Sequence, residues 1–209
     1  MKFVDIHTHR SFAAENEIFV RNLSINEAET VLPKKLGGFY SVGIHPWDVG
    51  NVDETDFQKL EKLCHNEQVR LIGECGFDKN IDIPFETQLS VFEKHVAISE
   101  NLKKPMIIHC VGYYNEVASL RKQVNPIQQW IIHGFRGKPQ LAEQLLRAGF
   151  LLSFGEKYNQ ESVKVCPLEH LFVETDESKK AISEIYAEIA QLKECLINEI
   201  RAGFDLLSC

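Results

Sequence analysis

Short apolar runs recur along the chain and predict a set of buried strands. The runs are four to six residues long, are rich in Val, Ile, Leu and Phe, and mostly end in polar residues. They cover residues 3–7, 17–21, 39–44, 69–73, 105–109, 130–133, 150–154 and 171–174. Apolar runs of this length are typical of parallel strands that are buried on both faces. The pattern therefore predicts eight parallel strands.

Amphipathic helical patterns occupy most of the intervals between these runs. They cover residues 53–65, 85–102, 139–148 and 181–207, of which the last is the longest candidate helix. Alternating strands and helices predict an α/β fold with a parallel sheet. Eight strands favour a compact (β/α)8 TIM-type barrel, and an open sheet with two extra edge strands is the alternative. Only residues 10–16 separate the first two strands, too few for a crossover helix, so we expect the barrel to lack that helix.

Composition places the chain among ordinary globular proteins. A length of 209 residues suits one domain, so we expect residues 1–209 to form a single barrel domain. No apolar stretch approaches the ~20 residues that cross a bilayer. Asp5 and His7 stand where a signal peptide would be apolar. The 6 cysteines form no CxxC pair, which is typical of reduced thiols. We therefore expect a cytoplasmic protein without a membrane partner.

The charge balance is acidic, with 23 Lys and Arg against 30 Asp and Glu and a net charge of −7. This balance argues against a protein that coats nucleic acid, because such binding depends on a basic excess. Basic residues nevertheless follow several predicted strands, namely Arg10, Lys79, Arg136, Lys138, Lys157, Lys179 and Lys180. A basic rim at one end of a barrel would concentrate phosphate groups there. Each of these side chains alone is equally well explained as a solvated loop residue.

Side chains that bind metals follow the same strands. His7 and His9 end the first predicted strand, and residues two apart on a strand share a face. The later strands carry one such residue each at their carboxyl ends: Glu74, His109, His133 and Asp176. Because barrel active sites are built at that end, we expect all six side chains to converge. Nitrogen and oxygen ligands of this kind suit a pair of divalent cations.

Two divalent cations held together would form a hydrolytic centre. Such a pair lowers the pKa of a bridging water and stabilises the charge that develops on the oxygens of the scissile group. Glu74 is able to bridge the two ions. Asp176 is able to bind a metal and to accept the proton of the attacking water. The ligand types do not select among Mg²⁺, Mn²⁺ and Zn²⁺.

Seven ordered segments resemble the TatD-related metal-dependent deoxyribonucleases of the amidohydrolase superfamily. They are DIHTH at 5–9, GIHPWD at 43–48, IGECGFD at 72–78, PMIIHC at 105–110, HGFRG at 133–137, GFLLSFG at 149–155 and ETD at 174–176. The resemblance implies a two-metal barrel phosphoesterase, often a 3′–5′ exonuclease on DNA. It implies metal ligands at the six residues named above, with Glu74 as the bridge. It also implies that His45 faces the substrate and that Arg136 contacts a phosphate, although His45 as a turn-capping residue is the alternative.

The chain departs from the family pattern at two places. Val111 stands where the family commonly has an arginine. After Asp176 the family usually has a long loop with Arg, Asn and Pro, whereas residues 177–180 here lead almost directly into the last helix. Both departures leave the metal ligands intact and remove groups that would hold the substrate. Cleavage of DNA from an end is therefore our first expectation, and hydrolysis of a small phosphorylated substrate is a variant of it.

Other interpretations remain open. The same metals would activate water for attack on a small amide, ester or lactone. A non-catalytic barrel-derived binding protein is a further alternative, against which the complete ligand set argues. Trp47 is a candidate for stacking on a nucleobase, and packing at the barrel rim is its alternative. Cys75 and Cys110 directly follow metal-ligand candidates, so strand alternation turns them away from the site as buried thiols.

Overall fold

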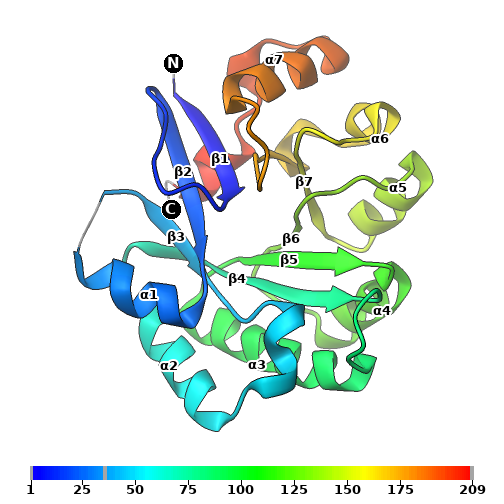
Figure 1. Cartoon of the computed structure of the whole chain (residues 1–209). Helices are drawn as coiled ribbons and strands as arrows, with labels where there is room; N and C mark the ends of the chain where they lie inside the picture. Colours follow the sequence, from blue (N-terminus) through cyan, green and yellow to red (C-terminus); the bar gives the residue numbers. More distant parts are fainter. Residues whose placement is uncertain (1, 35–36, 208–209) are drawn as a thin grey trace. The chain divides into compact units, whose positions relative to one another are not determined.

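The computed structural model describes residues 2–34 and 37–207, over which strands and helices alternate (Figure 1). The strands are β1 (Phe3–Thr8), β2 (Glu17–Leu23), β3 (Phe39–Val42), β4 (Val69–Asp78), β5 (Met106–Val111), β6 (Trp130–Ile132), β7 (Leu151–Phe154) and β8 (Leu171–Val173). They are parallel and follow one another in chain order within a single sheet. This is the strand order of a (β/α)8 barrel, so the expected fold class is confirmed.

All eight apolar runs are strands, and their ends differ from the prediction mainly at β4. The predicted run stops at Gly73, whereas β4 continues to Asp78 and pairs with β5 along that extension. The prediction stopped early because Glu74 and Asp78 are acidic, yet both side chains are buried in the structure. Because buried acidic residues occupy the carboxyl end of β4, its apolar pattern predicted a strand that is too short.

The helices cover most of the predicted intervals. They are α1 (Ile25–Val31), α2 (Glu54–Cys64), α3 (Phe85–Leu102), α4 (Tyr114–Val124), α5 (Pro139–Arg147), α6 (Gln160–Val165), α7 (Ile182–Lys193) and α8 (Ala202–Leu207). The helices expected over 53–65, 85–102 and 139–148 are confirmed to within one residue at each end. Residues 9–16, all of which the structure describes, contain no helix, as expected for the connection between β1 and β2.

The prediction of one helix over 181–207 is wrong. Helix α7 ends at Lys193, and the next residue, Glu194, has a left-handed backbone with φ of 51°. The N–H groups of Glu194 and Cys195 donate to the carbonyls of Gln191 and Ala190 and so cap the helix. A short 3-10 turn and α8 follow. The apolar spacing of a helix continues across this break, and spacing alone does not show where a left-handed residue ends a helix.

The chain comprises two compact units. One contains residues 2–21 and 131–207, and the other contains residues 22–34 and 37–130. In the first, the hydroxyl of Tyr186 on α7 donates to the Val4 carbonyl of β1 at 3.0 Å. In the second, Phe92 of α3 packs edge-on against the fully buried Trp130, with ring centroids 5.2 Å apart. Each unit carries part of the predicted site.

Most of the cysteines are buried and free, as the composition predicts. Cys64, Cys75, Cys110 and Cys166 are buried and free, and burial raises the pKa of Cys110 to about 12. Cys75 and Cys110 are thus buried thiols, as expected, whereas Cys209 lies outside the described residues. Within residues 2–34 and 37–207, no helix is long and apolar enough to cross a membrane.

A buried histidine links α3 to the end of β3 in the second unit. His95 is fully buried; its Nδ1 lies 2.8 Å from the Val91 carbonyl, and its Nε2 accepts the Ile44 N–H at 2.9 Å. Only a neutral imidazole with its proton on Nδ1 satisfies both bonds. Burial lowers the pKa of His95 to about 4, so the ring stays neutral at ordinary pH.

His95 should make the free energy of unfolding depend on pH. The unfolded chain protonates His95 near pH 6.5, whereas the folded protein resists protonation until about pH 4. The free energy of unfolding therefore falls as the pH is lowered from 6.5 toward 4, by about 3 kcal/mol at pH 4 from this group. Urea denaturation at several pH values would measure the fall in the wild type and in His95→Gln. The difference between the two proteins should shrink toward pH 4, and a constant difference would contradict the assignment.

Candidate metal centre

Four predicted metal ligands lie together in the first unit. The ligand atoms of His7, His133 and Asp176 lie within 4.8 Å of one another. Asp176 Oδ1 is 3.7 Å from His7 Nε2 and 3.6 Å from His9 Nε2. The ring centroids of His7 and His133 are 4.3 Å apart, and His7 is fully buried. Three imidazoles thus surround one carboxylate.

Backbone hydrogen bonds fix Asp176 against the end of β1. Its N–H donates to the His7 carbonyl at 3.0 Å, and its own carbonyl accepts the His9 N–H at 3.2 Å. Asp176 has a left-handed backbone with φ of 53°, a conformation that costs free energy for a residue with a side chain. The two bonds offset that cost and set the carboxylate of Asp176 between His7 and His9.

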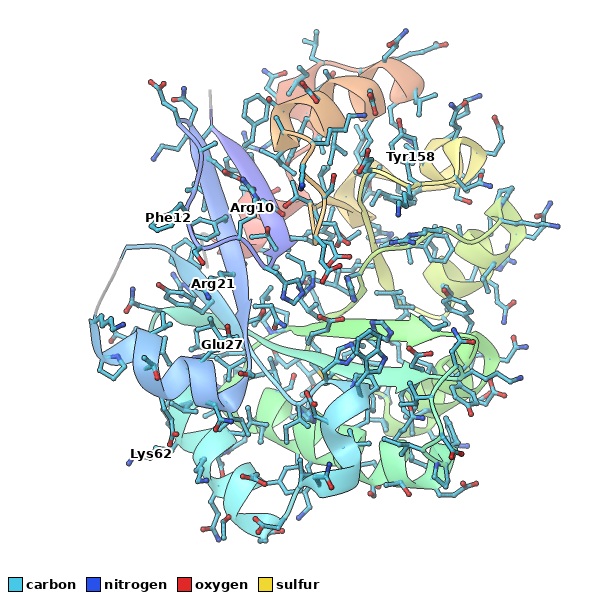
Figure 2. All side chains as sticks on the ribbon, viewed as in Figure 1. Arg10, Phe12, Arg21, Glu27, Lys62 and Tyr158 are labelled. Atoms are coloured by element: carbon cyan, nitrogen blue, oxygen red, sulfur yellow. The ribbon has the colours of Figure 1, made fainter. Side chains whose placement is uncertain are left out.

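A buried carboxylate beneath these ligands joins β1 to the segment after β8. Asp5 Oδ1 accepts the Thr175 N–H at 2.9 Å, and Asp5 Oδ2 accepts the Thr175 hydroxyl at 2.5 Å. Arg10, on the connection between β1 and β2 (Figure 2), donates to the same Oδ2 at 2.7 Å and also binds Glu17. Burial raises the pKa of Asp5 to about 7, and the bonds from Thr175 and Arg10 limit the rise. Arg10 is therefore engaged inside the fold.

A second buried carboxylate orients His133. Glu174 Oε1 lies 3.4 Å from His133 Nδ1 and accepts the Gly134 N–H at 2.7 Å. Burial alone would raise the pKa of Glu174, but His133 beside it holds that pKa below its ordinary value. An ionised carboxylate at Nδ1 favours the tautomer protonated there, which leaves the Nε2 lone pair of His133 for a metal.

The second unit brings together His45, Glu74 and His109. Glu74 Oε1 lies 2.9 Å from His109 Nδ1 and 3.3 Å from His45 Nε2. The Glu74 side chain is 5% exposed, so its charge faces little solvent. Gly76, with φ of 140°, lies where an added Cβ would come 2.1 Å from the His109 carbonyl oxygen. Glycine at 76 therefore lets β4 approach β5 beside Glu74 and His109.

Hydrogen bonding gives His45 a different role from His109. His45 Nδ1 accepts the Trp47 N–H at 3.2 Å, which caps the 3-10 helix η2 (Pro46–Asn51). A neutral ring that accepts at Nδ1 carries its proton on Nε2, and a protonated nitrogen has no lone pair for a metal. His45 is thus an N–H donor toward Glu74. Its Nδ1 caps a turn, as the turn-capping alternative expected, and its role toward a substrate stays a prediction.

Three buried carboxylates behind the histidines had no role assigned from the sequence. They are Asp5, Asp78 and Glu174. Asp78 Oδ2 lies 3.4 Å from His109 Nε2 and accepts the indole N–H of Trp47 at 2.9 Å. Their position in the sequence could have identified them, because each carboxylate lies within two residues of a predicted ligand or at the end of the strand that carries one.

Arg136 lines a cavity of about 410 Å³ in the first unit together with Lys157, Lys179 and Asp176. Two other basic residues of the expected rim have different partners: Lys180 pairs with Glu188, and Lys79 lies 5.9 Å from the centroid of the Tyr113 ring. The cations at the first unit's site thus reduce to Arg136, Lys157 and Lys179.

The donor groups fit divalent metal ions. In the first unit the ligand atoms of His7, His133 and Asp176 come within 4.8 Å of one another, and in the second Glu74 Oε1 lies 2.9 Å from His109 Nδ1. Borderline and hard divalent cations bind such mixed donors. The carboxylates of Glu174 and Asp78 lie 3.4 Å from His133 Nδ1 and His109 Nε2, on the side where metal-binding histidines usually have a second hydrogen-bonding group.

A family model described as TatD related DNase matches residues 4–202. The chain belongs to this family. The protein YabD of Bacillus subtilis, named an uncharacterized metal-dependent hydrolase, is 28% identical over 184 residues, which cover 78% of this chain and 72% of YabD. The 3'-5' ssDNA/RNA exonuclease TatD of Cronobacter sakazakii is 26% identical over 180 residues, covering 80% of this chain and 68% of that protein.

A solved TatD structure has the same fold. The TatD homolog YjjV of Escherichia coli superposes with a TM-score of 0.84 at 19% identity, over 98% of this chain and 95% of YjjV. The protein is therefore a TatD-type metal-dependent hydrolase on a TIM-type barrel, and it uses divalent metal. The number of ions and the ligand roles stay predictions.

Divalent metal should stabilise the fold, because it binds the native ligand cluster more tightly than the unfolded chain. Mn²⁺ at 100 times its dissociation constant should add about 2.7 kcal/mol for one ion, seen as a rise in Tm. In Glu174→Gln, loss of the carboxylate behind His133 should weaken metal binding about 10- to 100-fold. Calorimetric titration would measure this, with Glu184→Gln, an exposed acid of α7 in the same unit, as the matched control. Equal affinity in both variants would exclude the role given to Glu174.

Proposed function

We propose that this hydrolase cleaves phosphodiester bonds of DNA from an end, in the manner of a 3′–5′ exonuclease. The observation that carries the proposal is the cavity of the first unit, where Arg136, Lys157 and Lys179 adjoin Asp176. Cations beside a candidate metal ligand suit a phosphorylated substrate, because they bind the phosphate where it would be attacked. The relative from Cronobacter sakazakii, named a 3'-5' ssDNA/RNA exonuclease, supports the same substrate class.

The proposed ligands of two divalent ions are the six residues expected from the sequence, His7, His9, Glu74, His109, His133 and Asp176. The cluster of His7, His133 and Asp176 in the first unit and the pair of Glu74 and His109 in the second each support the proposal. When bound, such ions lower the pKa of water and offset the charge on the phosphate oxygens. Mg²⁺, Mn²⁺ and Zn²⁺ all suit these donors. The bridging role of Glu74 rests on the sequence resemblance.

Side chains of this protein would carry out proton transfer and substrate binding. Asp176 takes the proton of the attacking water at a carboxylate oxygen, since its backbone bonds hold that group beside His7 and His9. A substrate oxygen that replaced Glu74 as the partner of His45 Nε2–H would accept a hydrogen bond from that group. Arg136 binds a phosphate by its guanidinium, which suits two phosphate oxygens at once. The carboxylates of Glu156 and Glu177 also line the cavity, so its charge is mixed outside this cationic part.

A small phosphorylated substrate is the second candidate. Two observations favour it: Val111 supplies no cation, and only residues 177–181 connect Asp176 to α7. Both reduce the groups that would hold a long strand. A small amide, ester or lactone substrate is a third outcome of the same assay. Membership of a hydrolase family argues against the non-catalytic binding protein.

Cleavage of end-labelled single-stranded DNA tests the proposal. The wild type with Mg²⁺ or Mn²⁺ should shorten the strand from its 3′ end, and a chelator should abolish the reaction. Asp176→Asn should lower kcat by roughly 10²- to 10⁴-fold through loss of the proton acceptor. Asparagine tolerates the left-handed backbone at 176, so this variant should fold. Cleavage of a small ester or amide without any cleavage of phosphodiesters would overturn the proposal.

Arg136→Gln should raise KM for DNA about 10-fold or more, because a charge-assisted bond to phosphate is lost. Lys138→Gln is the matched control, since it removes one positive charge two residues away and Lys138 is exposed outside the cavity lining given above. Steady-state kinetics on one oligonucleotide at fixed salt would compare the two. If both variants raise KM equally, the effect is general charge attraction rather than a phosphate contact by Arg136.

A further inference from the structure

Trp47 combines exposure with a fixed orientation. Its side chain is 64% exposed, among the largest exposures of apolar residues in the described part of the chain. Ile127 and Leu196 are comparably exposed, at 86% and 68%, but they have no polar atom that could anchor them. Trp47 does have such an atom, and its indole nitrogen is bound.

The anchor of Trp47 is a buried carboxylate. The indole Nε1–H donates to Asp78 Oδ2 at 2.9 Å, and Asp78 is 4% exposed at the end of β4. The ring also contacts the His45 ring edge to face, with centroids 4.9 Å apart. Together the hydrogen bond and the ring contact restrict the indole while its surface stays open to solvent. Packing at the rim does not account for a ring that keeps most of its surface exposed.

The position of Trp47 relates it to the candidate site of the second unit. Asp78, which holds the indole, lies 3.4 Å from His109 Nε2. His45, which packs on the indole, lies 3.3 Å from Glu74 and has its ring centroid 4.6 Å from that of His109. An aromatic surface held by the same groups that face the site suits a planar part of the substrate.

We propose that Trp47 is a stacking platform for a nucleobase of the strand whose phosphodiester is cleaved. This inference rests on the proposed function and adds the part of the substrate that the metal ligands and cations leave unbound. Every base has a π face, so stacking binds bases with little regard to sequence. Such a platform also compensates for the missing arginine at Val111, because it holds the nucleotide by its base.

Fluorescence tests the contact without any cleavage. The chain has 2 tryptophans, and Trp130 is fully buried. In the chelator-treated full chain, oligodeoxythymidylate should quench the emission of Trp47. In Trp47→Phe, which keeps only Trp130, the same titration should leave the emission unchanged. Equal quenching in both proteins, or no quenching in the wild type, would overturn the stacking.

Kinetics on matched substrates separate stacking from catalysis. Trp47→Gln keeps a donor for Asp78 but has no ring. On a normal oligonucleotide it should raise KM roughly 5- to 150-fold with little change in kcat, the range expected for one base stacked on an aromatic ring. On an oligonucleotide with abasic sites at the cleaved end, wild type and variant should have the same KM. Ile127→Gln is the control, since Ile127 is as exposed but precedes β6, at the opposite ends of the strands.

The outcomes distinguish this inference from the function on which it rests. An equal loss on both oligonucleotides would mean that Trp47 acts on His109 through Asp78, and would overturn the platform while hydrolysis stands. A wild type that cuts neither oligonucleotide refutes the nuclease. The fluorescence titration then still decides whether Trp47 contacts a base.

Discussion

The first unit's site depends on the pairing of Asp176 with the end of β1. Two backbone hydrogen bonds join Asp176 to His7 and His9, and the Thr8 hydroxyl bonds to the same Asp176 carbonyl at 3.3 Å. Without these bonds the backbone of Asp176 would not be held against β1, and His7 and His9 would lack their acidic partner. The buried bonds of Asp5 to Thr175 hold the pairing from beneath.

Both units place a carboxylate behind an imidazole. Glu174 lies at Nδ1 of His133, and Asp78 lies at Nε2 of His109. A histidine with one nitrogen held in this way would offer a metal only the other one, so the carboxylate would select the ligand atom. The same bonding logic sets His45 apart, because its Nδ1 accepts a backbone N–H and its Nε2 therefore carries the proton.

Much of the fold was predictable because burial leaves a periodic mark on the sequence. Eight apolar runs correspond to eight strands, and the absence of a helix between β1 and β2 followed from the short interval of residues 10–16. The clustering of candidate ligands was predictable where residue type is specific, as for His7 with His133 and Asp176. The break after Lys193 was not, because apolar spacing continues past a reversed backbone. Nor were the roles of Asp5 and Glu174, since nothing in a single sequence shows whether an acidic side chain is buried.

The two units differ in how their residues are distributed along the chain, and this bears on synthesis. The second unit is one continuous stretch, residues 22–34 and 37–130 among those described. The first unit consists of two segments, residues 2–21 and 131–207, and the hydrogen bond from Thr8 to Asp176 joins residues 168 positions apart. On a ribosome, contacts within the continuous unit can form before residues 131–207 are made. His7 and His9 gain their contacts with Asp176 only after residue 176 has been synthesised, so the nascent chain carries two histidines without this carboxylate until then.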